Sequence, residues 1–207
     1  MGISYFLGSL PFGWLLGRLA GQDIRRAGSR NIGATNVLRL CGWRYGIAAL
    51  LLDAAKGAAA ALLVAKTWLP SAGGPLPSAD WLPPALCGAM AVLGHTFPIW
   101  FWFKGGKGVA TGAGVVGVLM PWPLAAGLAV FLAVAAFTRY ISLGSMSGAA
   151  AIALTATLLA AWAPTDAHAV PWPLAIFAWL LAVLIVWLHR ANIDRLRRGT
   201  ESRFGKN

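Results

Sequence analysis

The stretch that decides the fold is residues 81–103, WLPPALCGAMAVLGHTFPIWFWF, and it is followed at once by Lys104-Gly-Gly-Lys107. The stretch contains no Asp, Glu, Lys or Arg. A helix rises 1.5 Å per residue, so a run of this length crosses the roughly 30 Å hydrocarbon core of a bilayer. The sequence therefore predicts a transmembrane helix that ends in a cluster of lysine and glycine at the membrane edge.

The composition supports the same class for the whole chain. Of its 207 residues, 58% are hydrophobic and 11% are charged, whereas a soluble domain is about 25% charged. Further apolar runs cover residues 1–19, 45–69, 109–120, 122–137, 143–163 and 172–188. We therefore expect an all-α integral membrane protein with a single polytopic domain over residues 1–207. The run 109–120 is short, about 18 Å as a helix, so a re-entrant hairpin is its alternative.

The distribution of Lys and Arg decides between six and seven crossings. With seven, the cationic loops 18–44, 104–107, 139 and the tail from residue 190 all lie on one side, and loops 71–80 and 164–171, which lack Lys and Arg, lie on the other. With six, Arg139 and the tail would change sides and break the positive-inside rule. The sequence predicts seven transmembrane helices, with the N-terminus outside and the C-terminus in the cytoplasm.

The net charge of +11 fits this sidedness and an anionic partner. The aromatic residues lie in apolar runs rather than among the basic ones, so no nucleic acid is expected. Cys41, Cys87 and three His have no metal-ligand spacing, so no metal site is expected. Membrane lipids are the expected surroundings.

Glycines at four-residue spacing end the first run, at Gly13, Gly17 and Gly21. Such small-xxx-small spacing favours close contact with another helix. We interpret this stripe as a helix-packing surface.

Three ionisable residues fall inside the apolar runs. Asp53 and Lys56 are three residues apart, and because a lone charge in a membrane is costly, they are expected to pair or to face a polar cavity. His95 precedes Pro98 and is interpreted as a packing residue. On a continuous helix it would lie nine residues, or about 13 Å, from Lys104.

Four polar clusters fall on the predicted cytoplasmic side. The first is Gly28-Ser-Arg-Asn-Ile-Gly-Ala-Thr-Asn-Val-Leu-Arg39. Its hydroxyls, amides and guanidinium groups suit the oxygens of a phosphate or a polyol. A solvated loop with Ser29 or Asn31 as a helix cap is the simpler explanation, but the density of polar residues favours a binding site.

The second cluster is Lys104-Gly-Gly-Lys-Gly-Val-Ala-Thr111. Glycine allows backbone N–H groups to approach a ligand, and a turn followed by a helix N-terminus can bind an anion. The order does not fit a nucleotide-binding P-loop. Two lysines could simply anchor a helix end among lipid headgroups, but an anchor needs no glycine. We therefore interpret the loop as a phosphate site.

The third and fourth clusters are Arg139-Tyr-Ile-Ser142-Leu-Gly-Ser145 and the segment from His189 through Asn192 to Glu201. The third is explained locally by a basic anchor and a helix cap. In the fourth, His189 and Asn192 project together from a helix end. A catalytic pair of His189 with Asp194 is disfavoured, because five residues of helix place them about 140° apart.

These motifs together resemble the acyl-phosphate-dependent glycerol-3-phosphate acyltransferases of bacterial membranes, the PlsY family. The resemblance extends over essentially the whole chain. One departure is Arg30, where many members have glycine. The motifs that carry it are Gly8–Gly13, Gly28–Arg39, Leu93–Pro98, Phe103–Thr111, Arg139–Ser145 and His189–Leu196.

The resemblance implies transfer of an acyl group from acyl phosphate to the 1-hydroxyl of glycerol 3-phosphate, the first acylation in phospholipid synthesis. The products would be lysophosphatidic acid and phosphate. No covalent acyl-enzyme and no cofactor are needed, since an acyl phosphate is already activated. An upstream enzyme that forms the acyl phosphate is a further expected partner.

The resemblance also implies roles for the polar residues. Arg39, Ser29 and Asn36 would grip glycerol 3-phosphate, and Asn31 and Thr35 belong to the same substrate-binding set. The glycine loop would hold the acyl phosphate and stabilise charge on the departing phosphate. Its expected contributors are Lys104, Gly105, Gly106, Lys107 and Gly108.

Lys104, Ser142, His189 and Asn192 are the expected catalytic residues. His189 and Asn192 would orient the attacking hydroxyl, and Ser142 or Ser145 would add a hydrogen bond. The proton acceptor is either His189 or the phosphate of the substrate, and we favour the substrate because the sequence gives His189 no carboxylate partner.

Two other classes remain open. A transporter of phosphorylated metabolites would place polar groups through the membrane depth and often contain inverted repeats. A metal-dependent phosphatase or phosphotransferase would need clustered carboxylates. The six acidic residues are scattered, at positions 23, 53, 80, 166, 194 and 201.

Overall fold

The computed structural model describes residues 1–68, 81–162 and 169–205. The chain forms two compact units, Met1–Leu119 and Met120–Asn207. The expected outer loop at 71–80 and most of the one at 164–171 lie outside the described residues. The single domain expected over residues 1–207 stays a prediction.

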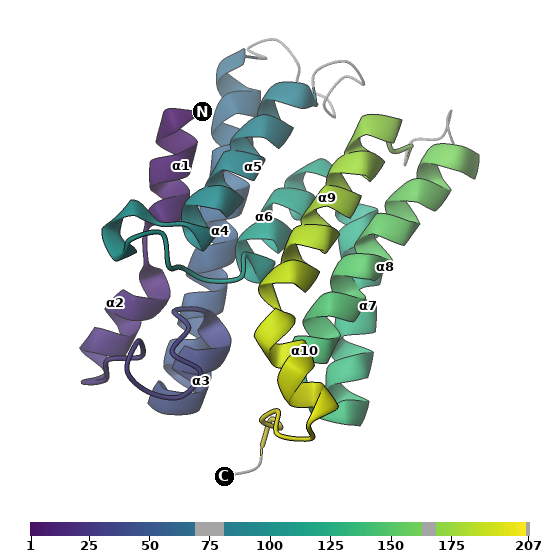
Figure 1. Cartoon of the computed structure of the whole chain (residues 1–207). Helices are drawn as coiled ribbons and strands as arrows, with labels where there is room; N and C mark the ends of the chain where they lie inside the picture. The colour runs from purple at the N-terminus through teal and green to yellow at the C-terminus, as the bar shows by residue number, and fades with distance from the viewer. Residues whose placement is uncertain (69–80, 163–168, 206–207) are drawn as a thin grey trace. The chain divides into compact units, whose positions relative to one another are not determined.

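In the N-terminal unit, the long helix α4 lies at the centre and packs against α2, α3, α5 and α6 (Figure 1). Small residues allow this contact: a methyl group on Gly57 would overlap the carbonyl oxygen of Thr111 in α6, and one on Gly114 would overlap that of Ala54 in α4. The elements of this unit are α1 (Gly2–Ser9), α2 (Phe12–Leu19), α3 (Ala34–Cys41), α4 (Trp43–Trp68), α5 (Leu82–Thr96), the 3₁₀ turn η1 (Ile99–Phe101) and α6 (Val109–Leu119).

Gly13 and Gly17 of α2 lie mainly against the loop that follows α2, so the interpretation as a surface for close contact between two helix backbones is wrong for these two. A methyl group on Gly13 would overlap the carbonyl oxygen of Ile32, and one on Gly17 would approach the side chain of Ile24 to 2.8 Å. Ile24 and Ile32 are buried in a small core with Val37. The stripe therefore makes room for the polar loop between α2 and α3 and fixes its position.

The C-terminal unit is a smaller bundle in which α8 packs against both α7 and α9. A methyl group on Gly127 of α7 would approach the carbonyl oxygen of Gly148 of α8 to 2.8 Å, so these two backbones nearly touch. Helices α9 and α10 meet at an angle of 56°. The elements are α7 (Pro121–Thr138), α8 (Ile141–Trp162), α9 (Trp172–Leu188) and α10 (Arg190–Arg197).

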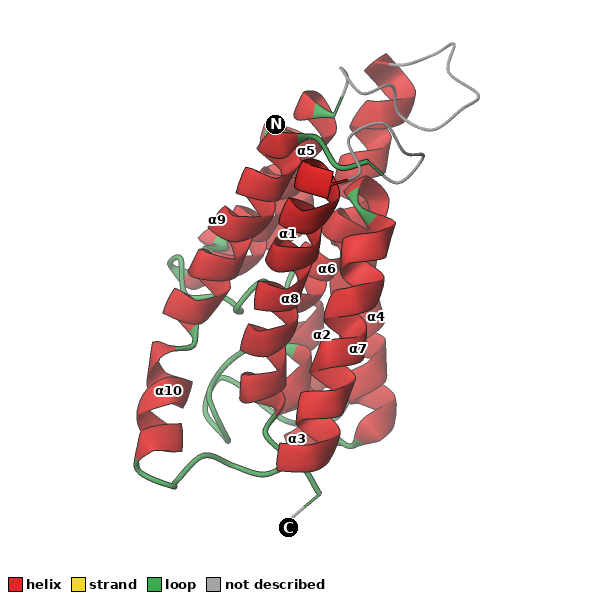
Figure 2. Cartoon of the chain, turned by 90° about the vertical axis from the view of Figure 1, so that its right-hand side faces the viewer, coloured by secondary structure: helices red, strands yellow, loops and turns green. Residues whose placement is uncertain are grey.

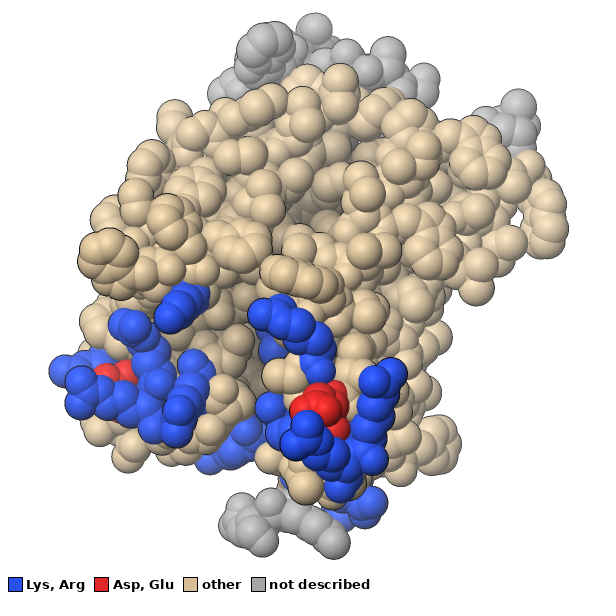
Figure 3. All heavy atoms as spheres, in the orientation of Figure 1, with Lys and Arg blue, Asp and Glu red and all other residues tan. Residues whose placement is uncertain are grey.

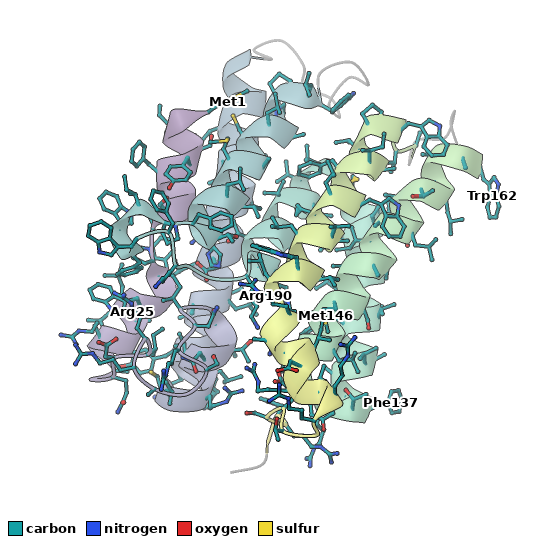
Figure 4. All side chains as sticks on the ribbon, in the orientation of Figure 1. Met1, Arg25, Phe137, Met146, Trp162 and Arg190 are labelled. Atoms are coloured by element: carbon teal, nitrogen blue, oxygen red, sulfur yellow. The ribbon has the colours of Figure 1, made fainter. Side chains whose placement is uncertain are left out.

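The described helices confirm an all-helical integral membrane protein. Four are long and apolar enough to cross a membrane, Trp43–Leu63, Leu82–Phe101, Pro121–Thr138 and Ile141–Trp162, and the bent pair α9–α10 makes up to five. Large apolar side chains point outward, such as Phe137 at 89% and Trp162 at 81% exposed, at opposite ends of their unit (Figure 4). The first expected span is broken between α1 and α2 at Leu10-Pro11, and α6 is short. The count of seven stays a prediction.

Basic side chains collect at one end of the N-terminal unit. Figure 3 shows Lys and Arg over the end that holds α2 and α3, and Arg25 lies at that end while Met1 lies at the other (Figure 4). In the C-terminal unit the basic residues surround α10 (Figure 3). Trp122, Trp162 and Trp172 are exposed at the start of α7, the end of α8 and the start of α9. Within each unit, the charge is distributed as one membrane face would require.

The contact of Gly13 with the loop can be tested by Gly13→Ala. The added methyl group would overlap Ile32, and overpacking of this kind costs about 1–3 kcal/mol. We expect the Tm in detergent to fall by roughly 2–10 °C as the loop shifts. Gly2→Ala is the matched control, because a methyl group there meets nothing within 4 Å. Equal Tm values for the two variants would contradict the packing role.

Candidate active site

The polar loop before α3 is organised by one buried amide. The Asn36 side chain is 2% exposed. Its Nδ2 donates to the carbonyl oxygens of Ile24 at 2.9 Å, Asn31 at 3.0 Å and Ala27 at 3.3 Å. Its Oδ1 accepts the N–H of Ser29 at 3.0 Å. These bonds show that the Asn36 amide shapes the loop. The expectation that it also grips glycerol 3-phosphate stays a prediction.

Asn31 connects this loop to the glycine loop. Its Oδ1 accepts the N–H of Gly33 at 2.8 Å, and its Nδ2 donates to the carbonyl oxygen of Gly105 at 3.4 Å. The first and second polar clusters, 74 residues apart in sequence at this contact, therefore lie side by side within the N-terminal unit.

The glycine loop folds back onto the end of α5. The N–H of Gly105 donates to the carbonyl of Thr96 and the N–H of Gly106 to the carbonyl of His95, both at 3.0 Å. These carbonyls are among those that a helix C-terminus leaves unpaired. Both N–H groups thus bond to carbonyls within the chain. The expectation that the Gly105 and Gly106 amides hold a phosphate stays a prediction. Gly108 has φ +73°, which glycine adopts without strain, and α6 begins directly after it.

Cationic side chains surround these two loops. Arg39 and Lys104 are exposed, as are Ser29, Arg30 and Thr35, and Lys107 is half-buried. Arg25 lies over the ring of Phe101, 4.4 Å from its centroid. The N-terminal unit thus offers cations and hydroxyls on a loop framework whose main chain is fixed by Asn36 and Asn31, which suits an anionic ligand.

In the C-terminal unit, the third and fourth clusters meet at Glu201. Its Oε1 accepts hydrogen bonds from Ser142 Oγ at 2.7 Å and Asn192 Nδ2 at 2.6 Å, and its Oε2 accepts one from Arg195 Nε at 2.7 Å. Two of the expected catalytic residues, Ser142 and Asn192, are thereby brought together. Ser145 instead donates to the carbonyl of Ile141 in its own helix at 2.9 Å.

The role of Glu201 does not show in the sequence. Glu201 is one of six acidic residues scattered along the chain, and its bond to Ser142 spans 59 residues. Burial by itself raises the pKa of the Glu201 carboxyl, but hydrogen bonds from Asn192, Ser142 and Arg195, with the charge of Arg195, outweigh it and hold that pKa below its usual value. Glu201 is therefore an anion at neutral pH.

The segment after α10 is tied to the turn between α7 and α8. The N–H of Phe204 donates to the carbonyl of Arg139 at 2.7 Å, and Arg203 Nε donates to the Tyr140 hydroxyl at 3.1 Å. Figure 2 shows this segment running from α10 back to the end of α7. These contacts keep Glu201 in place beside Ser142.

His189 is buried at the bend between α9 and α10, with 3% of its surface exposed. Its Nδ1 lies 2.8 Å from the carbonyl oxygen of Ile185. A carbonyl only accepts hydrogen bonds, so Nδ1 carries the proton and, in a neutral ring, Nε2 is the basic nitrogen. Asp194 pairs instead with Arg198 at 2.9 Å, as expected for an exposed i,i+4 pair.

The ionisable residues inside the apolar runs are paired as expected. Lys56 Nζ lies 2.8 Å from Asp53 Oδ1, and both side chains are 2% exposed. His95 Nδ1 lies 3.5 Å from the same oxygen. The continuous helix assumed between His95 and Lys104 is wrong, because α5 ends at Thr96 and the chain reverses, which brings Gly106 of the glycine loop onto His95.

The structure thus assembles the expected site residues into two groups, one in each unit. Ser29, Asn31, Asn36 and the glycine loop form the first, and Ser142, Asn192 and Glu201 form the second. In the part of the chain that the structure describes, no three His, Cys, Asp or Glu side chains lie close enough to share a metal ion. The residues present are those of an anion site.

Comparison with known proteins identifies the family of this chain. The sequence model of the family described as glycerol-3-phosphate acyltransferase matches residues 1–199. A glycerol-3-phosphate acyltransferase of Desulfotalea psychrophila (strain LSv54 / DSM 12343) is 44% identical over 205 residues, which cover 99% of this chain and 96% of that protein.

Two solved structures are also similar. Both are crystal structures of PlsY (YgiH), an integral membrane glycerol 3-phosphate acyltransferase, in its glycerol 3-phosphate form and in its lysophosphatidic acid form. Each is 37% identical and covers 98% of this chain and 92% of its own, with TM-scores of 0.83 and 0.80.

Fold, site and similarity define a class, the integral-membrane acyltransferases. Within that class, this chain belongs to the glycerol-3-phosphate acyltransferase family, PlsY.

The role of Glu201 can be tested by Glu201→Gln. A neutral amide weakens three hydrogen bonds to a charged group, so we expect a loss of about 2–3 kcal/mol in the free energy of unfolding and a lower kcat. Because the pKa of Glu201 is lowered in the folded chain, its stabilisation is present at neutral pH and is lost as the pH falls below the usual value of 4.5. The Tm difference between the two proteins should therefore be largest near neutral pH and shrink below pH 4.5.

Asp194→Asn is the matched control, because it removes a carboxylate from the same segment that is 56% exposed and pairs only across one helical turn. Such pairs contribute a few tenths of a kcal/mol. A Glu201→Gln protein as stable and active as Asp194→Asn would contradict the positioning role of Glu201.

Proposed function

We propose that this protein transfers a fatty acyl group from acyl phosphate to the 1-hydroxyl of glycerol 3-phosphate. The products are lysophosphatidic acid and inorganic phosphate. The observation that carries the proposal is the pairing of motifs within each unit: the Gly28–Arg39 and Lys104–Gly108 loops in one, and Ser142 with Asn192 in the other. Each pair combines groups that bind phosphate or hydroxyl oxygens.

The two loops of the N-terminal unit bind different phosphates. Arg39 and Ser29 take the phosphate of glycerol 3-phosphate, with Thr35 beside them. Lys104 and Lys107 take the acyl phosphate. Opposite charges about 4 Å apart near a protein surface attract by roughly 4 kcal/mol before desolvation, so several cations offset the repulsion between two phosphates.

The reaction is a direct displacement at the acyl carbon. The 1-hydroxyl oxygen of glycerol 3-phosphate forms a bond to the acyl carbonyl carbon, and the bond from that carbon to the phosphate oxygen breaks. The negative charge that builds on the departing phosphate is stabilised by Lys104. Asn192 and Ser142, both held by Glu201, orient the attacking hydroxyl. No covalent acyl-enzyme forms.

The proton of the hydroxyl goes to a substrate phosphate. His189 Nδ1 donates to the carbonyl oxygen of Ile185, which orients the ring. A phosphate dianion, with a second pKa of about 6, is about as basic as an ordinary imidazole. His189 therefore acts by orienting the hydroxyl.

The chain crosses the membrane seven times, with its N-terminus outside and its catalytic residues at the cytoplasmic face. The positive-inside distribution of Lys and Arg supports this topology, as does the location of basic residues at one end of each unit. Acyl phosphate then arrives from the inner leaflet of a bacterial cell membrane, supplied by an upstream enzyme that forms it, and glycerol 3-phosphate arrives from the cytoplasm.

A donor assay tests the reaction. Purified protein receives glycerol 3-phosphate with palmitoyl phosphate or with palmitoyl-CoA, and lysophosphatidic acid is measured. We expect turnover of glycerol 3-phosphate with palmitoyl phosphate but not with palmitoyl-CoA, and the rate should be unchanged by EDTA. Turnover with the thioester but not with the acyl phosphate would overturn the donor assignment, and uptake of a phosphorylated metabolite into vesicles without acylation would favour a transporter.

The proton acceptor is tested by the pH dependence of kcat/KM in His189→Ala. Loss of an orienting contact should lower kcat/KM by roughly 10–100-fold. If a substrate phosphate is the base, the acid limb near pH 6 should remain in the variant. An acid limb that disappears with the imidazole would make His189 the base instead.

A further inference from the structure

Beneath the glycine loop lies a buried polar cluster to which the proposed reaction assigns nothing. It consists of Asp53 and Lys56 of α4 and His95 of α5. As whole residues they are 1%, 3% and 5% exposed. Lys56 Nζ donates to the carbonyl oxygen of Leu10 at 2.8 Å, at the break between α1 and α2. The cluster therefore joins α4, α5 and the α1–α2 break inside the N-terminal unit.

His95 extends this cluster to the glycine loop. Its Nδ1 faces Asp53 at 3.5 Å, and the opposite edge of the ring lies against Gly106. A methyl group on Gly106 would overlap Nε2 of the ring, and its three nearest neighbours would all be atoms of that ring. The carbonyl of His95 also accepts the N–H of Gly106 at 3.0 Å. One residue thus contacts the same glycine through its side chain and its main chain.

The loop needs such a support because its path is strained. Trp102 and Phe103 precede Lys104 with φ of 52° and 60°, a left-handed conformation that costs a non-glycine residue roughly 1–2 kcal/mol. Strained segments persist only where their surroundings determine them. The main-chain bonds from Gly105 and Gly106 to the end of α5 hold the loop from one direction, and the imidazole fills the space under it.

We infer that His95, oriented by the Asp53–Lys56 ion pair, is a positioning residue that sets the position of the Lys104–Gly108 loop relative to the end of α5. Through this position it sets the affinity of the enzyme for the phosphate that the loop holds. The inference rests on the proposed function of that loop. His95 itself contacts neither substrate. Its effect reaches the reaction through Gly106 and the neighbouring lysines.

A double-mutant cycle on KM tests this coupling. Gly106→Ala places a methyl group against the imidazole, and His95→Ala removes the imidazole. We expect each single variant to raise KM for the phosphate substrate of the loop, and the effect of Gly106→Ala to be smaller by roughly 3–30-fold in the His95→Ala background. Lys104→Ala shows which of the two KM values, that for acyl phosphate or that for glycerol 3-phosphate, depends on the loop. KM does not depend on the fraction of protein that folds.

Gly105→Ala is the matched control. A methyl group there would meet the carbonyl oxygens of His95 and Thr96 and the ring of Pro98, but not the imidazole. Its effect on KM should therefore be the same with and without the His95 side chain. His95→Gln, which keeps a polar group of similar length, should recover part of the lost affinity.

Two outcomes would overturn the inference. One is a His95→Ala enzyme with wild-type KM for both substrates. The other is an effect of Gly106→Ala that is equal in both backgrounds. The donor assay precedes the cycle and fixes the substrates, so a failed cycle with a working donor counts against His95 alone.

Discussion

The geometry of the N-terminal unit depends on one buried amide, the side chain of Asn36. The loop before α3 has an irregular main chain, and its polar groups need partners once they are removed from water. Asn36 donates to three carbonyls and accepts the N–H of Ser29. These bonds fix the loop from which Asn31 reaches Gly105. The exposed cations on both loops are then presented from a rigid base, which limits the entropy lost when a phosphate binds.

In the C-terminal unit the organising group is a charged carboxylate, that of Glu201, rather than a neutral amide. A carboxylate in a protein of net charge +11 that handles phosphates would repel its substrates if its charge were uncompensated. Here its two oxygens accept bonds from Ser142, Asn192 and Arg195. The guanidinium offsets the negative charge, and the acceptor oxygens orient the two neutral side chains. The protein thus gains a rigid, charge-assisted support at little electrostatic cost to anion binding.

The sequence predicted what periodicity and composition control. Long apolar runs gave the helical membrane class, and the spacing of Asp53 and Lys56 gave their ion pair. Contacts between distant segments could not be read in this way: Glu201 meets Ser142 across 59 residues, and no local pattern marks the pair. The positions of His95 and of the α2 glycines were misjudged for a related reason. Each was placed by assuming a continuous helix or a helical neighbour, whereas the chain reverses after Thr96 and a loop packs on Gly13.

The buried ion pair of Asp53 and Lys56 is hard to explain by stability alone. Removing two charges from water costs several kcal/mol each, and their attraction often only balances that cost. An apolar pair at the same positions would fill the same space in α4. What an apolar pair could not provide is direction: Lys56 bonds to the carbonyl of Leu10 where α1 ends, and Asp53 faces the ring that lies under Gly106. Because the two charges cancel, the ion pair adds no net charge to the membrane interior. It also connects α4 to the end of α1 through Leu10 and to α5 through His95. Its retention in an otherwise apolar helix is therefore better explained by the precision it gives to the loop above it.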